Sequence, residues 1–302
     1  MDIDLVIPMV FPSDPVWQRD YERSHGGTAF AAARNVRWRS WGTEELLVRC
    51  VMKYMPWLHR IHLLLASVSQ EQRWMAGMAA DGKVVVHHHA DFIPKEYLPC
   101  FASPCIEMFL DRIPGLSEHF IYANDDMFPL SPLDASDFFR PSPDGCLLPC
   151  QHFTEKPAPA SPNIFQRKCR YQLNMVAAPF GRHYTRTYLK ATHSFAPILK
   201  SSCEEVWRRH GAEITKWLSP VRRTDRSYNH YIYSLYQHFS GLYVDHVPRE
   251  QYAGRSARTS ALAAVIRDPA AGIVCLNDNE DIGDWEHRAA IVRREISVKL
   301  RQ

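Results

Sequence analysis

Short apolar runs alternate with segments of helical periodicity through the first half of the chain, and this alternation constrains the fold more than any other feature. Short strands separated by helix-sized connections pair in parallel, because a parallel crossover needs about a dozen residues or more. We therefore expect a mixed, largely parallel sheet covered by helices. The expected strands lie at 4–10, 61–65, 83–86 and 119–123, and the expected helices at 44–54, 70–78 and 103–111.

The second half of the chain has a different pattern. Residues 131–163 are rich in Pro, Ser and Asp, and they predict a long irregular connection, either an active-site loop or an insertion. Helical patterns then follow at 164–178, 195–210, 227–239 and 284–300, with a short strand near 241–244. Because no internal repeat divides the 302 residues, we expect one domain with a helical addition.

Membrane insertion is not predicted. No run approaches the roughly 18 consecutive apolar residues that a spanning helix needs. The start, MDIDLVIPMVFPSDP, lacks the cationic region of a secretory signal. We expect a cytoplasmic chain without a transmembrane segment, and peripheral contact at the inner face of the membrane stays open as an option for the basic face.

Charge is unevenly distributed along the chain. Between Arg167 and Arg258 there are 16 Lys and Arg against 6 Asp and Glu, a local net of +10. The whole chain has 36 Lys and Arg and 33 Asp and Glu. The rest of the chain therefore has 20 basic and 27 acidic residues, a net charge of −7. A basic segment of this kind indicates an anionic ligand or a solvated basic face. No helix-turn-helix, zinc-finger or RNP signature accompanies it, so we expect no nucleic-acid partner.

Two adjacent carboxylates follow the last strand of the first half. The apolar run His119–Ala123 leads directly into Asn124, Asp125 and Asp126. In open α/β sheets ligands bind at the carboxyl ends of the strands, and Mg²⁺ prefers carboxylate oxygens. The tripeptide is therefore a candidate metal site, although Asn and Asp are also common turn residues.

Several other polar side chains are candidates for chemistry. Glu107 lies in a largely apolar helical segment, so its carboxylate needs a partner, either Arg112 or a ligand. His193 is a candidate general base or a structural histidine. The triplet His87-His88-His89 alternates between the faces of a strand, so at most two of its members can share a site, and no zinc-binding spacing accompanies it. Candidate phosphate-binding guanidinium groups belong to Arg170, Arg222 and Arg223.

Four separated stretches, taken together, resemble the Stealth family. This family contains sugar-phosphate transferases of bacterial capsule synthesis and the animal lysosomal-enzyme N-acetylglucosamine-1-phosphotransferase. The most specific stretch combines SPCIEMFLDRIPGLSEHFIYANDDMF with RWRSWGTEELLVRCVMKYMPWLHRIHLLL and HHADFIPKEYLP upstream and with DFF downstream. The other three are IDLVIPMVFPSDPVW, then ATHSFAP followed by VRRTDRS, and finally IVCLNDNED.

The chain departs from the family pattern at two places. Phe11 and Pro12 precede Ser13-Asp14 where the family usually has Asp or Asn followed by Gly. Residues 102–104 read Ala-Ser-Pro where many bacterial members have Asn-Ser-His. The first departure concerns a contact with the nucleotide, and the second concerns the choice of sugar or acceptor.

The resemblance implies a reaction and its partners. A sugar-1-phosphate, with hexosamine-1-phosphate expected, would pass from a UDP-sugar to a hydroxyl of a polysaccharide or oligosaccharide acceptor. The products would be a phosphodiester and UMP, in capsular or exopolysaccharide synthesis. The expected cofactor is Mg²⁺, with Mn²⁺ as an alternative.

The resemblance also assigns roles to residues. The catalytic set is Glu107, Asp126, His193, Arg170 and Arg222. The donor-binding set is Ser13, Asp14, Arg39, Glu45, Arg112, Asn124 and Arg223. The metal ligands are Asp125, Asp126 and Asp278.

The expected fold is α/β, with a mixed, mostly parallel, Rossmann-like (GT-A-like) sheet flanked by helices and a basic, mainly helical C-terminal half. Residues 1–302 would form a single catalytic domain, in which 1–130 bind the nucleotide sugar and the metal, 131–163 connect, and 164–302 complete the site. Two alternatives remain at this point. One is a conventional metal-dependent glycosyltransferase that releases a nucleoside diphosphate. The other is a non-catalytic sugar-binding protein, which the altered Phe11-Pro12 turn favours.

Overall fold

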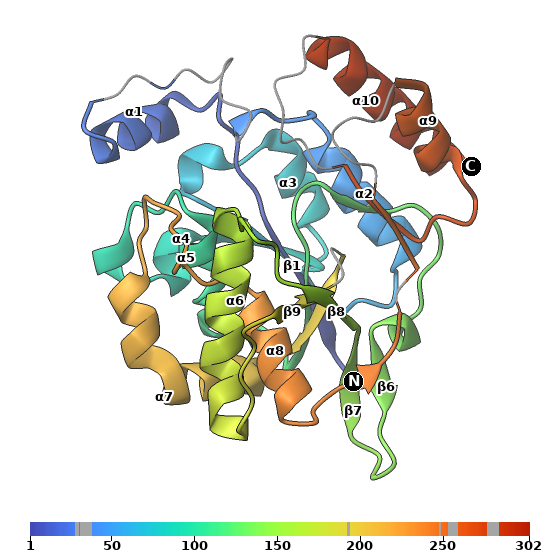
Figure 1. Cartoon of the computed structure of the whole chain (residues 1–302). Helices are drawn as coiled ribbons and strands as arrows, with labels where there is room; N and C mark the ends of the chain where they lie inside the picture. Colours follow the sequence, from blue (N-terminus) through green and yellow to red (C-terminus); the bar gives the residue numbers. More distant parts are fainter. Residues whose placement is uncertain (28–29, 31–37, 192–193, 248, 253–258, 277–283) are drawn as a thin grey trace.

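A five-stranded sheet forms the centre of the protein (Figure 1). The computed structural model describes all residues except 28–29, 31–37, 192–193, 248, 253–258 and 277–283. The order of the strands is β10-β4-β1-β2-β3, and only β10 runs antiparallel to its neighbour. Their bounds are β1 Ile3–Pro8, β2 Ile61–Leu65, β3 Val84–His88, β4 His119–Tyr122 and β10 Ala196–Leu199. The predicted mixed, mostly parallel α/β sheet is therefore confirmed.

Both faces of the sheet are buried under helices. Leu5 and Ile7 of β1 pack into one hydrophobic cluster, and Val6 between them packs into the other. This alternation follows from the two-residue period of a strand, and burial on both faces explains why the parallel strands read as continuous apolar runs. The first face is covered by α2 (Glu44–Tyr54) and α10 (Trp285–Arg301), and the second by α7 (Lys200–Trp217) and α8 (Tyr231–Phe239).

The second half of the chain contains the three longest described helices, α6, α7 and α10. In Figure 1, α6 (Ile164–Ala177) lies in front of α8, and the two helices pack against each other. The predicted helix at 195–210 instead begins as β10, because residues 196–199 are wholly apolar and pair with β4. The remaining helices are α1 (Pro15–Ser24), α3 (Arg73–Met78), α4 (His89–Phe92), α5 (Ser103–Glu107) and α9 (Thr259–Arg267).

Residues 131–163 are not the irregular connection that their composition predicted. They carry β6 (Phe139–Pro141), β7 (Leu147–Gln151) and β8 (Phe153–Pro157). Each strand is short and contains proline. Because proline is uncommon inside strands, the composition of this segment predicts a loop. β8 pairs with β9 (Thr187–Ala191) as a separate two-stranded antiparallel sheet, and α6 lies between the two strands in the sequence. The other strands are β5 (Met127–Pro129), β11 (Val244–Asp245), β12 (Glu250–Tyr252) and β13 (Ile273–Cys275).

None of the described helices is both long enough and apolar enough to cross a bilayer.

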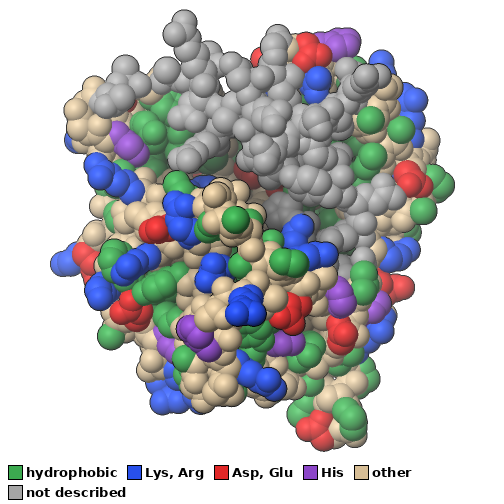
Figure 2. Space-filling model, in the orientation of Figure 1, with side chains coloured by type: hydrophobic (Ala, Val, Ile, Leu, Met, Phe, Trp, Pro, Cys, Tyr) green, Lys and Arg blue, Asp and Glu red, His purple; other side chains and the backbone are tan. Residues whose placement is uncertain are grey.

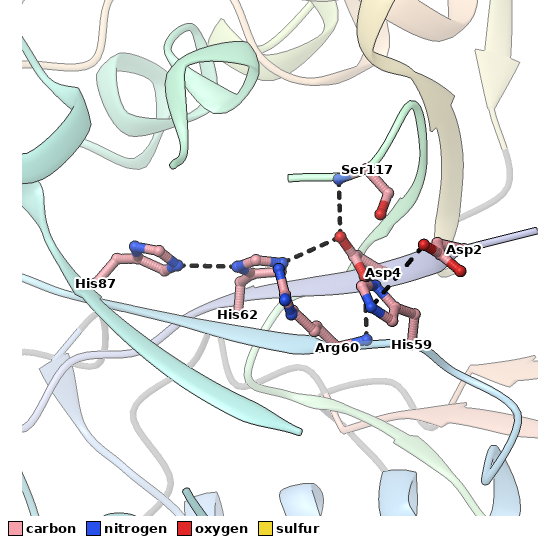
Figure 3. A network of polar contacts seen from close by, with 7 residues as sticks. All are labelled: Asp2, Asp4, His59, Arg60, His62, His87 and Ser117. Atoms are coloured by element: carbon pink, nitrogen blue, oxygen red, sulfur yellow. Dashed lines mark hydrogen bonds and ion pairs between the residues drawn. The ribbon is translucent and has the colours of Figure 1, made fainter. Parts of the chain in front are cut away.

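The amino ends of the central strands are joined by the buried carboxylate of Asp4 (Figure 3). Its Oδ1 accepts hydrogen bonds from the Arg60 N–H at 3.0 Å and from Nδ1 of His59 at 3.0 Å. Its Oδ2 accepts from the Ser117 N–H at 2.8 Å and from Nε2 of His62 at 3.2 Å. Burial alone would raise the pKa of Asp4, but the hydrogen bonds from His62 and Ser117 lower it to about 2. The carboxylate is therefore ionised and ties β1 to β2 and to the segment before β4.

His62 extends this network to a third strand. Its Nδ1 lies 2.9 Å from Nε2 of His87 on β3, and both imidazoles are buried. Burial lowers the pKa of His87 to about 4, so His87 is neutral at neutral pH and shares one proton with Nδ1 of His62 across this contact.

We expect Asp4→Ala to lower the free energy of unfolding by about 3 kcal/mol, because two backbone N–H groups and His62 would stay buried without an acceptor. Urea unfolding at neutral pH measures this difference. The matched control is Asp2→Ala, whose side chain is 67% exposed and lies 3.9 Å from His59. We expect the control to change stability by less than about 0.5 kcal/mol. Equal losses in the two variants would contradict the role given to Asp4.

Candidate active site

A cavity of about 1200 Å³ opens at the carboxyl ends of the parallel strands. The chain first adds β2 and β3 on one side of β1. It then crosses back and adds β4 on the other side, so the strand order reverses between β1 and β4. Ligands of open α/β sheets bind at such a switch point. The segments that follow β1, β2, β3 and β4 all contribute to the lining, and so do α6 and the two-stranded β8–β9 sheet.

The acidic pair lies directly after β4, as the sequence predicted. Asn124, Asp125 and Asp126 all line the cavity, and the backbone carbonyl of Asp126 accepts from the Leu276 N–H at 2.8 Å. Asp125 keeps part of its surface open to the cavity. The surrounding protein raises its pKa to about 8, and the charges of Asp126 and Glu44 add to that rise. The two adjacent carboxylates therefore hold a proton at neutral pH unless a cation lies between them.

Glu107 pairs with a histidine that the sequence did not single out. Its Oε2 accepts from the backbone N–H of His230 at 2.7 Å and lies 3.0 Å from Nδ1 of the same residue. Both side chains are 6% exposed. Burial would raise the pKa of Glu107, but the hydrogen bond and charge of His230, together with Lys168, lower it below its ordinary value. Glu107 is thus an ionised carboxylate that orients the His230 ring.

The His230 ring is fixed from several sides. The ring of Tyr122 lies 4.4 Å from it, centroid to centroid, and so does the ring of Tyr231. Because Glu107 holds Nδ1, Nε2 is the ring nitrogen left for a ligand, and His230 lines the cavity. A carboxylate that holds one imidazole nitrogen while the other faces a cavity is the arrangement of a general base.

Cations from the basic half of the chain reach the same cavity. Lys168 on α6 and Arg223 line it, and so do Lys156 and Lys190 on the two-stranded β8–β9 sheet. Burial lowers the pKa of Lys168, whereas the charge of Glu107 acts to raise it. Nη2 of Arg223 donates to Oγ of Ser103 at 2.8 Å. Lys and Arg side chains also lie across the outer face where α6 is seen (Figure 2). The two charge classes that the sequence separates therefore face each other across one cavity.

Of the predicted site residues, five line the cavity and belong together in space. These are Glu107, Asn124, Asp125, Asp126 and Arg223. His193 and Asp278 lie outside the described residues, so their predicted roles stay predictions.

Four residues of the predicted donor-binding set, all within the first 50 positions, do not line the cavity. Asp14 caps α1 by accepting from the Val16 N–H at 2.9 Å, and Ser13 precedes it in the same turn. Arg39 lies over the Trp285 ring at 4.0 Å. Glu45 pairs with Arg49 at 2.7 Å on the surface of α2.

Three predicted arginines also lie elsewhere. Arg112 covers the rings of Phe109 and Trp207 at 5.0 and 5.5 Å. It is therefore not the partner of Glu107 that the sequence allowed. Nη2 of Arg170 donates to the Thr185 carbonyl at 3.1 Å, and Arg222 is exposed in a turn.

Sequence reasoning missed His230 and Lys168. The need of a buried Glu107 for a partner was a usable signal, but it could not identify a histidine 123 positions further along the chain. Lys168 was counted only as part of the basic segment.

Comparison with known proteins identifies related chains. Residues 37–145 match the family described as Stealth protein CR2, conserved region 2. A capsular polysaccharide phosphotransferase of Actinobacillus suis is 31% identical over 240 residues, which are 76% of this chain and 61% of that protein. The receptor polysaccharide phosphotransferase WefC of Streptococcus oralis is 27% identical and covers 94% of this chain and 92% of its own length.

The chain spans about three fifths of the length of the first of these relatives. Among solved structures, the apo-form glycosyltransferase GlyE of Streptococcus pneumoniae aligns with a TM-score of 0.45 and 12% identity, covering 100% of this chain and 62% of that one.

We expect Asp125→Asn to stabilise the metal-free protein by about 1 kcal/mol at about pH 8, because it removes a carboxyl group crowded by Asp126. The unfolded carboxyl ionises near 3.8 and the folded one near 8, so the folded state loses stability as pH rises between these values. Urea unfolding in a chelator at about pH 5 and about pH 8 should give the larger gain at the higher pH. Asp20→Asn, at a side chain that is 43% exposed on α1, serves as the control, and a gain that did not grow with pH would contradict the assignment.

Proposed function

The chain belongs to the Stealth family, and we propose that it transfers a sugar-1-phosphate from a UDP-sugar to a hydroxyl of a glycan acceptor. The products would be a phosphodiester and UMP. The observation that carries this proposal is the single cavity in which Asp125 and Asp126 face Lys168 and Arg223. Its relatives are called capsular and receptor polysaccharide phosphotransferases, which agrees with a polysaccharide substrate.

We propose a hexosamine-1-phosphate as the group transferred, in capsular or exopolysaccharide synthesis. Attack of the acceptor oxygen at phosphorus would leave the anomeric carbon–oxygen bond intact, so the sugar keeps its configuration. Such transfer depends mainly on positioning and on neutralising charge around phosphorus.

Mg²⁺, with Mn²⁺ as an alternative, is the proposed cofactor, held by Asp125 and Asp126. The raised pKa of Asp125 fits this assignment, because two crowded carboxylates favour a bound cation. Among the described residues no cluster of three or more acidic, His or Cys side chains surrounds a metal position. Mg²⁺ usually takes one or two carboxylates and completes its shell with water and substrate phosphates, where it neutralises the phosphate charge. The predicted third ligand, Asp278, lies outside the described residues.

Lys168 and Arg223 are the proposed contacts of the diphosphate on the basic side. Both line the cavity, and an arginine fork matches two phosphate oxygens. Arg170 and Arg222 remain weaker candidates for this role, since neither lines the cavity in the described structure.

His230 is the proposed proton acceptor for the attacking hydroxyl. Glu107 holds its Nδ1, which leaves Nε2 to take the proton and stabilises the imidazolium that results. His193 remains the alternative base that the family resemblance implies.

The reaction is tested by incubating the protein with Mg²⁺, glycan acceptors and a panel of UDP-hexosamines and UDP-hexoses. We expect release of UMP in equal amount to a phosphodiester product, measured by ion-exchange chromatography and mass spectrometry. Asp126→Asn should abolish turnover. Release of UDP would instead indicate a conventional glycosyltransferase, and donor binding without turnover would indicate a sugar-binding protein.

We expect His230→Gln to lower kcat by about 10²- to 10³-fold with the KM for the donor little changed, because the base acts only in the transition state. His238→Gln, on α8 and outside the cavity, is the control. A variant at position 230 with the kcat of the wild type would remove His230 from the mechanism.

A further inference from the structure

The cavity has two ends of different chemistry. The charged end holds Glu107, Asp125 and Lys168 near β4 and α6. The other end lies over β1, β2 and β3 and is lined by apolar and aromatic groups. These are Met9, Trp17, Trp38, Ala66, Phe101 and Cys100. Three strand spacings separate β4 from β3, a distance of about 14 Å across the sheet.

One polar ring stands in the apolar end. His89 follows β3, lines the cavity and is 4% exposed. Its Nδ1 is buried and has no hydrogen-bond partner among the described residues. A buried polar atom without a partner is rare in a native protein and calls for a ligand, a water or another explanation.

The two preceding histidines, His87 and His88, already have hydrogen-bond partners. Nε2 of His87 bonds His62, and Nε2 of His88 lies 2.9 Å from Oε1 of Glu71. The ring of Phe92 packs edge-on against His89 at 6.0 Å and fixes its orientation. His89 is therefore the member of the triplet whose ring is both held in place and open to a new hydrogen bond.

The aromatic side chains at this end of the cavity are also fixed by their packing. Trp17 meets the rings of Trp38 and Phe101 edge-on at 5.0 and 5.4 Å. Asp14, which caps the helix of Trp17, also accepts from Oγ of Ser69 at 2.5 Å and from Nε2 of Gln70 at 3.2 Å. Asp14 thus holds the helix that carries Trp17 in place, although Asp14 itself does not line the cavity.

A lining of aromatic and apolar side chains with one polar ring fits a heterocyclic base better than a hexose. A base offers two apolar faces for stacking and one polar edge. A hexose carries several hydroxyl groups, and each would need a partner if it were buried here. At the charged end, the diphosphate of the same ligand would meet Lys168 and Arg223.

We propose that His89 hydrogen-bonds the polar edge of the donor's nucleobase, which stacks in the apolar end of the cavity over β1–β3. This inference rests on the proposed function and adds a residue that selects the nucleotide. Burial, followed by the charge of His88, lowers the pKa of His89 to about 4, so the ring is neutral at neutral pH and supplies one donor and one acceptor.

Calorimetric titration of the metal-free protein with UMP, CMP, AMP and GMP tests the assignment without any turnover. We expect His89→Leu to weaken UMP binding by about tenfold or more, because the base edge would be buried unpaired. His89→Asn, which keeps a polar atom near the position of Nδ1, should stay within about threefold of the wild type. The neighbour His88→Asn should bind UMP as the wild type does.

Thermal unfolding of the free variants separates recognition from structural support. We expect His89→Leu to be at least as stable as the wild type, because it removes an unpaired buried polar atom. Unchanged UMP affinity in His89→Leu would overturn the role of His89, and so would equal losses in the Leu and Asn variants accompanied by reduced stability. If the wild type bound none of the four nucleotides, the proposed nucleotide-sugar donor itself would be wrong.

Discussion

The central sheet depends on one buried carboxylate at its amino end. Asp4 accepts four hydrogen bonds from His59, Arg60, His62 and Ser117, which bring together β2 and the segment before β4 (Figure 3). A buried charge is tolerated only when its oxygens are satisfied, so this network permits one register for the strands. The opposite ends of the same strands are then held at fixed spacing, and the cavity forms there.

Two aspartates of the same sheet show how burial and partners separate a structural role from a functional one. Hydrogen-bond donors surround Asp4 and lower its pKa to about 2, whereas Asp125 lies beside Asp126 and has a pKa raised to about 8. The first arrangement is complete within the protein. The Asp125–Asp126 pair is unfavourable until a proton or a cation binds between the two carboxylates. Proteins keep such destabilising groups where function requires them.

The sequence predicted the parts that local pattern determines. Apolar runs located β1 to β4 and the acidic pair after β4, since a buried parallel strand needs no distant partner to be recognised. β6 to β8 were missed because they are short and contain proline. The Glu107–His230 pair and the cavity-facing Lys168 depend on how α5, α6 and α8 pack, which no local spacing encodes.

The histidine triplet illustrates where a local rule ends and packing decides. Alternation along a strand correctly separates the faces of His87 and His88, but it cannot tell which ring finds a partner. β2 and β3 pair in parallel with Leu64 opposite His87. His62 lies two residues before Leu64 on the same face of β2, so its ring can reach that of His87. His89 lies one residue past the strand and lines the cavity, and its buried Nδ1 has no partner in the part of the chain that the structure describes. The strand pattern therefore locates the triplet, whereas the packing of β2, β3 and the segment after β3 decides which of its rings finds a partner.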